Sequence, residues 1–117
     1  MNALKKEILR IATGLLLREI PLPTNCSVCT VGGLKTAIAS VLQERKGRIA
    51  LYPTPATLTG EDAEIFLEVV WDLLCARIIT PKDCLNGFDE KGLNGIRLHS
   101  DAEDNWKKFK VVVGISD

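Results

Sequence analysis

The stretch from residue 59 to residue 81 constrains the fold more than any other part of the chain. Its sequence, TGEDAEIFLEVVWDLLCARIITP, places apolar residues at helical spacing and then ends in a β-branched run closed by a proline. Thr59, followed three residues later by Asp62, is close to a capping box and predicts where the helix begins. At 100° per residue, one face of the helix gathers the residues that we expect to face the core: Ala63, Phe66, Leu67, Val70, Leu73 and Leu74. The chain must therefore pack a long amphipathic helix that leads directly into a strand.

Two more helices are predicted before this one. The first covers residues 2–19, with Asn2 as its cap and the Pro-Leu-Pro of residues 21–23 as its stop. The second covers the stretch GGLKTAIASVLQERKG, which ends at Gly47 after a basic last turn that suits the negative end of the helix dipole. Apolar residues recur at helical spacing in both helices, namely Leu4, Ile8, Ile11, Ala12 and Leu15 in the first and Leu34, Ala37, Ile38 and Val41 in the second. Two prolines in the following stretch, LYPTPATLT, exclude a continuous helix and predict an extended or looped connection.

A β-hairpin and a short helix are predicted for the C-terminal part. The segment IITP predicts a first strand, KDCLNGFDEKGLNG a long loop, and IRLHS the returning strand. The capping box SDAE, residues 100–103, predicts a helix from Asp101 to about Phe109 with Trp106 facing the core. The closing VVVGI is expected to form an edge strand or a packed tail.

Length and composition predict one folded domain over residues 1–117, because 46% of its residues are hydrophobic and can bury a core. Arg10, Arg18 and Glu19 interrupt the apolar N-terminal stretch, which has no small-residue cleavage site and does not predict an export signal. No apolar run approaches the roughly 20 residues of a membrane helix. We therefore expect a soluble cytoplasmic protein without membrane contact, in which disulfides are not favoured.

The order helix, helix, helix and then a two-stranded hairpin with a flexible tip resembles that of a winged helix-turn-helix domain over about residues 3–109. The resemblance lies mainly in FLEVVWDLLCARIITP, followed after a loop by GIRLHS. It implies an α+β fold of winged-helix type, with three main helices, a two-stranded β-hairpin as the wing and a short C-terminal helix. It also implies double-stranded DNA binding and transcription regulation, with the third helix in the major groove and Lys82 and Lys91 near the wing contacting the backbone.

The outer side of the third helix is acidic. The helical wheel gathers four carboxylates at spacings of three and four residues, with no base at i+4 to pair with them: Glu61, Glu64, Glu68 and Asp72. Affinity for duplex DNA comes largely from bases that neutralise phosphates, and a contact to cytosine could account for only one of these carboxylates. Either DNA is bound elsewhere on the protein, or this face binds a protein partner.

The basic residues lie mostly in the N-terminal half. Residues 1–58 carry eight basic and three acidic side chains (net +5), residues 59–106 four and eleven (net −7), and residues 107–117 three and one (net +2). Such asymmetry is typical of polyanion binding or charge-matched association, and also of solvated faces without a partner. DNA binding, by a monomer or a dimer, would use Lys35, Arg45, Lys46 and Arg48. The alternative is a protein-interaction module whose acidic face takes a basic partner or the basic half of a second copy.

Trp71 lies at the edge between the core-facing and solvent-facing sides of the third helix. A tryptophan in such a place usually packs beneath a neighbouring loop with its indole N–H satisfied. It can also anchor a partner, because partly exposed tryptophan is enriched at interface hot spots. Trp71 therefore joins the four acidic residues as a candidate for partner binding.

The cysteines and the single histidine do not predict an enzyme. Cys26 and Cys29 have the spacing of half a zinc site, for which Cys84 and His99 are the candidate remaining ligands. A redox pair would need a strand before CSVC and a helix directly after it, so ordinary thiols are the simpler interpretation. No nucleophile with an orienting partner is spaced to form a triad with the histidine. We therefore expect no catalytic activity, no metal and no cofactor.

Overall fold

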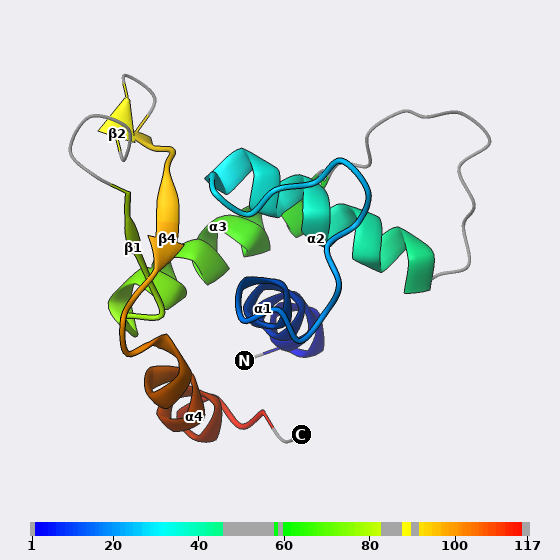
Figure 1. Ribbon diagram of the computed structural model, residues 1–117. Coiled ribbons are helices and arrows are strands. Elements are labelled where there is room, and N and C mark those ends of the chain that lie inside the picture. The colour runs from blue at the N-terminus through cyan, green and yellow to red at the C-terminus, as the bar shows by residue number, and fades with distance from the viewer. Residues whose placement is uncertain (1, 46–57, 59, 83–87, 90–91, 116–117) are drawn as a thin grey trace.

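The computed structural model describes residues 2–45, 58, 60–82, 88–89 and 92–115, and it has an α+β fold (Figure 1). The helices are α1 (Ala3–Leu16), α2 (Val31–Arg45), α3 (Glu61–Cys75) and α4 (Ala102–Val112). The strands form two antiparallel pairs, β1 (Ile79–Pro81) with β4 (Ile96–Leu98) and β2 (Phe88–Asp89) with β3 (Gly92–Leu93). The predicted α+β class is therefore confirmed, with its three main helices, its antiparallel hairpin and its closing helix.

The ends of α1 follow local hydrogen bonding. Asn2 caps the helix as predicted, since its side-chain oxygen accepts a hydrogen bond from the Lys5 N–H at 2.7 Å. The helix stops at Leu16, three residues before the predicted end, because Arg18 adopts a left-handed φ of 62°. The chain therefore leaves the helix before it reaches the prolines that the sequence suggested as the stop.

Of the two predicted capping boxes, only the one at SDAE lies within the described residues, and it does not form as expected. Thr59 lies outside the described residues, and Gly60 occupies the N-cap of α3, with a φ of 58° and no side-chain cap. The N-cap of α4 is Asp101, one residue after the serine of SDAE, and its side chain forms no cap bond either. The Asp101 N–H instead donates to Nδ1 of His99 at 3.0 Å, so the turn before α4 is held by the imidazole.

The segment before α2 lies beside the hairpin. Thr30 forms an isolated antiparallel bridge with Gly95, and two flanking hydrogen bonds extend the pairing, Val31 N–H to the Asn94 carbonyl at 2.8 Å and Ile96 N–H to the Cys29 carbonyl at 2.9 Å. In the hairpin, Ile79 faces Leu98 and Pro81 faces Ile96. The start of α2 is therefore attached to β4 by its backbone.

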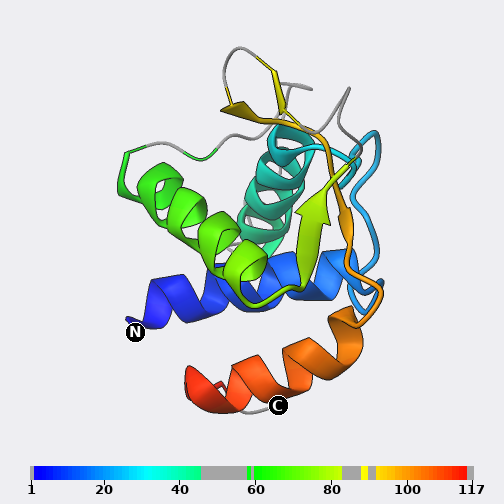
Figure 2. The same ribbon diagram turned by 90° about the vertical axis from the view of Figure 1, so that its left-hand side faces the viewer.

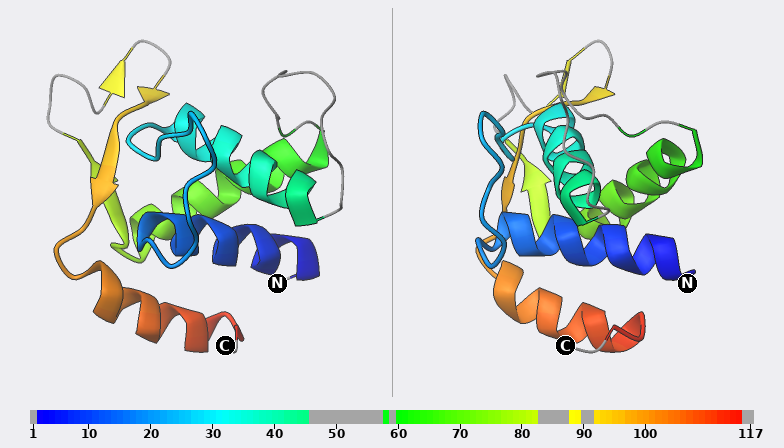
Figure 3. Two further views of the ribbon diagram at one scale, coloured as in Figure 1. Left: turned by 45° about the vertical axis from the view of Figure 1, so that its right-hand side comes forward. Right: turned by 90° about the vertical axis from the view of Figure 1, so that its right-hand side faces the viewer.

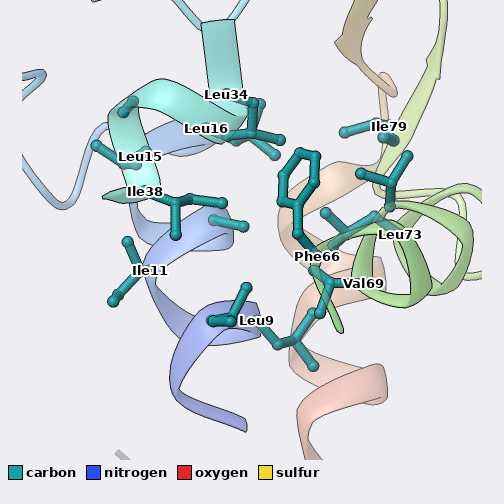
Figure 4. Packing of buried hydrophobic residues seen from close by; sticks show 14 of the residues in the cluster. Leu9, Ile11, Leu15, Leu16, Leu34, Ile38, Phe66, Val69, Leu73 and Ile79 are labelled. Atoms are coloured by element: carbon teal, nitrogen blue, oxygen red, sulfur yellow. The ribbon is translucent and has the colours of Figure 1, made fainter. Parts of the chain in front are cut away.

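One hydrophobic cluster joins the helices and the hairpin. Phe66 is 1% exposed and lies at its centre, between side chains of α1 and α2 on one side and of α3 and β1 on the other (Figure 4). Trp106 of α4 is buried as predicted and lies beside the ring of Phe109, with a centroid distance of 6.4 Å. Ile115 is also buried, so the C-terminal segment continues α4 to Val112 and then packs as a tail rather than forming a strand.

The buried face of α3 differs from the predicted one. Ile65 and Val69 are buried together with Phe66, whereas Leu67, expected in the core, is 56% exposed. The buried arc is rotated by roughly 70° from the predicted arc on a wheel of 100° per residue. The rotation follows from the neighbours of α3, because it packs against both α1 and β1. It turns Leu67 outward and brings Asp72 toward α1.

The helix α1 forms a middle layer of the molecule, with other helices on both sides of it. In Figures 1 and 2 and in both views of Figure 3, α1 lies between α4 on one side and α2 and α3 on the other. Within the described part of the chain, none of the helices combines the length and the apolar character needed to cross a membrane.

Candidate interaction surface on α3

The outer face of α3 combines exposed apolar and acidic side chains. Leu67 and Trp71, one helical turn apart, are 56% and 66% exposed. Glu64 and Glu68 are exposed beside them at helical spacing. We call these four residues the α3 outer face. Leu67 and Trp71 thus form a small exposed apolar patch on the side of α3 opposite its buried face, which makes this face a candidate contact surface.

The predicted row of four carboxylates is divided by Lys5 of α1. The Lys5 Nζ lies 3.0 Å from Asp72 Oδ2 and 3.7 Å from Glu68 Oε2. The hydrogen bond with Asp72, and then the charges of Asp72 and Glu68, raise the pKa of Lys5 above its usual value against the opposing effect of burial. Asp72 is half-buried by this contact. Lys5 therefore offsets one of the two negative charges in the C-terminal part of the row, mainly that of Asp72.

The N-terminal part of the row keeps its charge. Glu61 and Glu64 are exposed, and neither has an ion-pair partner among the residues that the structure describes. Glu61 lies in the first turn, where the helix dipole favours a carboxylate. The sequence predicts these acids but not the pairing of Lys5 with Asp72, because the two residues are far apart in the chain and no local spacing indicates the contact.

Trp71 does not pack beneath a neighbouring loop. Its 66% exposure favours the partner-anchor interpretation over the packing interpretation. Trp106, which the sequence placed in the core, is 7% exposed, so the two tryptophans of the chain occupy opposite environments. This difference gives Trp71 a spectroscopic use as a reporter of the α3 outer face.

The described members of the predicted basic set are separated. Lys46, Arg48 and Lys91 lie outside the described residues. Lys35 is half-buried in the first half of α2, and Arg45 is exposed at its last residue, about 15 Å further along the helix axis. In Figure 1 the start of α2 lies beside the hairpin and its end points away from it.

Arg45 instead belongs to a basic hollow that the sequence did not suggest. This hollow is lined by Lys6, Glu7 and Arg10 of α1, by Arg45, and by residues 114–115 of the C-terminal tail. Lys6 Nζ donates to the Gly114 carbonyl at 3.4 Å. Lys82 is exposed directly after β1, on the hairpin and thus apart from this hollow. The described bases therefore do not form one continuous face.

The three thiols that the structure describes are not assembled into a ligand set. Cys26 is half-buried, and Cys29 and Cys75 are exposed free thiols. Cys84, a candidate fourth ligand, lies outside the described residues. Among the side chains that the structure places, no three His, Cys, Asp or Glu residues lie together in an arrangement that could hold a metal ion. Cys29 contributes to the fold through its backbone, whose carbonyl accepts the Ile96 N–H.

Comparison of the chain with family models, with curated proteins and with solved structures gave no match.

Proposed function

We propose that the protein is a non-enzymatic protein-interaction module on a winged-helix scaffold, and that it docks a partner with basic and apolar side chains through the α3 outer face. The observation that carries this proposal is the exposure of Leu67 and Trp71 beside Glu64. Aromatic anchors surrounded by polar groups are typical of protein interfaces, where burying the ring supplies affinity and the rim charges supply selectivity.

The order of elements supports the winged-helix part of the proposal. A segment between α1 and α2 forms an isolated bridge from Thr30 to Gly95, directly before β4. α3 then runs directly into β1, and the hairpin returns before α4. In a winged helix-turn-helix domain, the helix in the position of α3 is the one presented to DNA. A scaffold of this kind therefore presents α3 outward, and the side chains of α3 decide what the protein binds.

Those side chains favour a protein over DNA. α3 carries five acidic residues and no basic residue within Glu61–Cys75. A helix placed in the major groove with this composition would oppose the phosphates, and an exposed indole would meet a charged, hydrated surface. A basic and apolar protein segment would instead pair with Glu64 and cover Leu67 and Trp71. The partner chemistry follows from these three side chains.

Site-specific photocrosslinking tests the proposal. A benzophenone amino acid replaces Trp71 in one variant and Glu44, an exposed residue of α2, in the matched control. We expect the variant with the benzophenone at position 71 to form adducts that protease degrades and nuclease does not. The variant labelled at position 44 should form none, and adding Glu64→Lys should abolish the adducts at position 71. With the partner purified, Trp71→Ala should weaken its Kd at least roughly tenfold, as expected for a hot-spot residue. Equal adducts from the two positions would contradict the proposal.

DNA binding is a second candidate, favoured by the hairpin beside the start of α2 and by the exposed Arg45. It would use Arg45 with Lys46 and Arg48 rather than α3. Three phosphate contacts give a slope near −2.7 for log affinity against log salt, so affinity should fall about 40-fold between about 50 and 200 mM salt. Fluorescence anisotropy of a labelled mixed-sequence duplex measures this slope. Its loss when the three bases are changed to alanine would support this candidate, and no binding at the lower salt would exclude it.

A further inference from the structure

α4 carries a second exposed apolar surface. Val111 and Val112 are 76% and 81% exposed, the highest exposure of any large hydrophobic residue in the described part of the chain. Lys107 and Lys108 are exposed one turn earlier, at spacings of three to five residues from the valines. We call these four residues the α4 outer face. The opposite side of α4 buries Trp106 in the core, so the exposed valines are not needed to hold the helix in place.

The α3 and α4 outer faces are complementary in charge and alike in apolar character. The α3 outer face offers Leu67 and Trp71 beside glutamates, and the α4 outer face offers two valines beside lysines. The α3 outer face extends over about two helical turns, roughly 10 Å along the axis, and the α4 outer face over about one and a half, roughly 8 Å. Two such faces in contact would bury both apolar pairs and place lysine opposite glutamate. Within one chain they cannot meet, because α1 lies between the two helices (Figure 2).

The placement of the helices allows α3 of each of two copies to contact α4 of the other. In Figure 2 and in the right-hand view of Figure 3, α3 and the C-terminal end of α4 lie toward the same side of the molecule, with the N-terminal end of α1 between them. A twofold axis passing near the start of α1 would bring α3 of each copy onto α4 of the other. Such an isologous arrangement closes on itself and leaves neither face exposed.

We infer that the partner of the α3 outer face is the α4 outer face of a second copy of this chain, in a twofold dimer. This inference rests on the proposed function, because it uses the same α3 surface, and it names the occupant of that surface. One helix-to-helix contact of this length is smaller than a stable interface, but the twofold axis doubles it. The inference can be tested by reversing the charge of Glu64 on α3 and of Lys108 on α4.

Sedimentation velocity over a range of protein concentrations at about 50 mM salt tests the inference. The unmodified chain should show a monomer–dimer equilibrium. Glu64→Lys and Lys108→Glu should each weaken dimerisation at least roughly tenfold, because each places like charges together at both symmetric contacts. An equimolar mixture of the two variants should recover the original dimer, since both contacts then pair opposite charges. Glu44→Lys, the same charge change on α2, is the matched control and should leave the dimer unchanged.

The outcomes separate this inference from the proposed function. A chain that remains monomeric at all concentrations, or a mixture that fails to recover dimerisation, overturns the α4 contact. If adducts from position 71 persist in that case, α3 still docks another protein. A dimer weakened by Lys108→Glu but indifferent to Glu64→Lys also overturns the inference, because α4 would then contact a different surface. All three variants change exposed residues, and their far-UV circular dichroism should match that of the unmodified chain.

Discussion

Phe66→Ala is expected to lower the free energy of unfolding by about 3–5 kcal/mol, because truncating a buried aromatic ring removes its transfer free energy and leaves a cavity. Phe66 is the largest of the fully buried side chains and lies where α1, α2, α3 and β1 meet (Figure 4). A loss of this size is a large fraction of the roughly 5–15 kcal/mol that stabilises an ordinary domain. Urea unfolding followed by circular dichroism measures it.

The adjacent residue provides the matched control. Leu67→Ala removes a side chain of similar apolar character that is 56% exposed, so it should change the free energy of unfolding by less than about 1 kcal/mol. The sequence pattern alone assigns both residues to the core, and it therefore predicts two large losses. A large loss for Leu67→Ala would mean that α3 presents the face predicted from the sequence and would remove the apolar component of the α3 outer face.

The sequence identified α3 and its approximate ends but not its orientation. Most positions of EIFLEVVWDLLC are apolar, so the helical wheel offers several overlapping apolar arcs of similar quality. Contacts with α1 and β1 select the arc that contains Ile65 and Val69. In α1, where polar residues separate the apolar ones more regularly, the predicted residues Ile8, Ile11 and Leu15 are all buried. The spacing of apolar residues is sufficient to predict the buried face of a helix only where it defines a single apolar arc.

The residues of the candidate site can also be predicted only in part from local sequence. Glu64 and Trp71 can be predicted from the sequence, because a charge and an indole stand out at any helical position. The pairing of Lys5 with Asp72 cannot, because it depends on how α1 crosses α3. The bridge between Thr30 and Gly95 was missed for the same reason, since one residue in a loop gives no strand pattern of its own. Contacts between distant segments set both the charge of the surface and the attachment of the hairpin.

Gly33→Ala is expected to destabilise the protein by about 2–3 kcal/mol, since it forces extra volume into a close backbone contact. A Cβ added at Gly33 would overlap the carbonyl oxygen of Ser27 and would lie 3.1 Å from Thr30 Oγ1, which accepts the Gly33 N–H at 2.9 Å. The overlapping atom is backbone, so the segment from Ser27 to Thr30 must move. That segment carries the bridge to Gly95, and the substitution should therefore loosen the hairpin as well as the start of α2.

Gly32→Ala gives the opposite expectation one residue earlier. Apart from its chain neighbours and the adjoining helix backbone, no atom lies within 4 Å of a Cβ placed at Gly32, which is exposed in the first turn of α2. Replacing a helical glycine by alanine without a clash stabilises the helix by up to about 1 kcal/mol. Urea unfolding should give shifts of opposite sign for the two variants, and hydrogen exchange should accelerate at the Ile96 N–H in Gly33→Ala alone, because that amide bonds to the Cys29 carbonyl. Changes of the same sign in the free energy of unfolding of the two variants would contradict the close packing of α2 against residues 27–30. They would also contradict the backbone attachment that holds the hairpin beside α2.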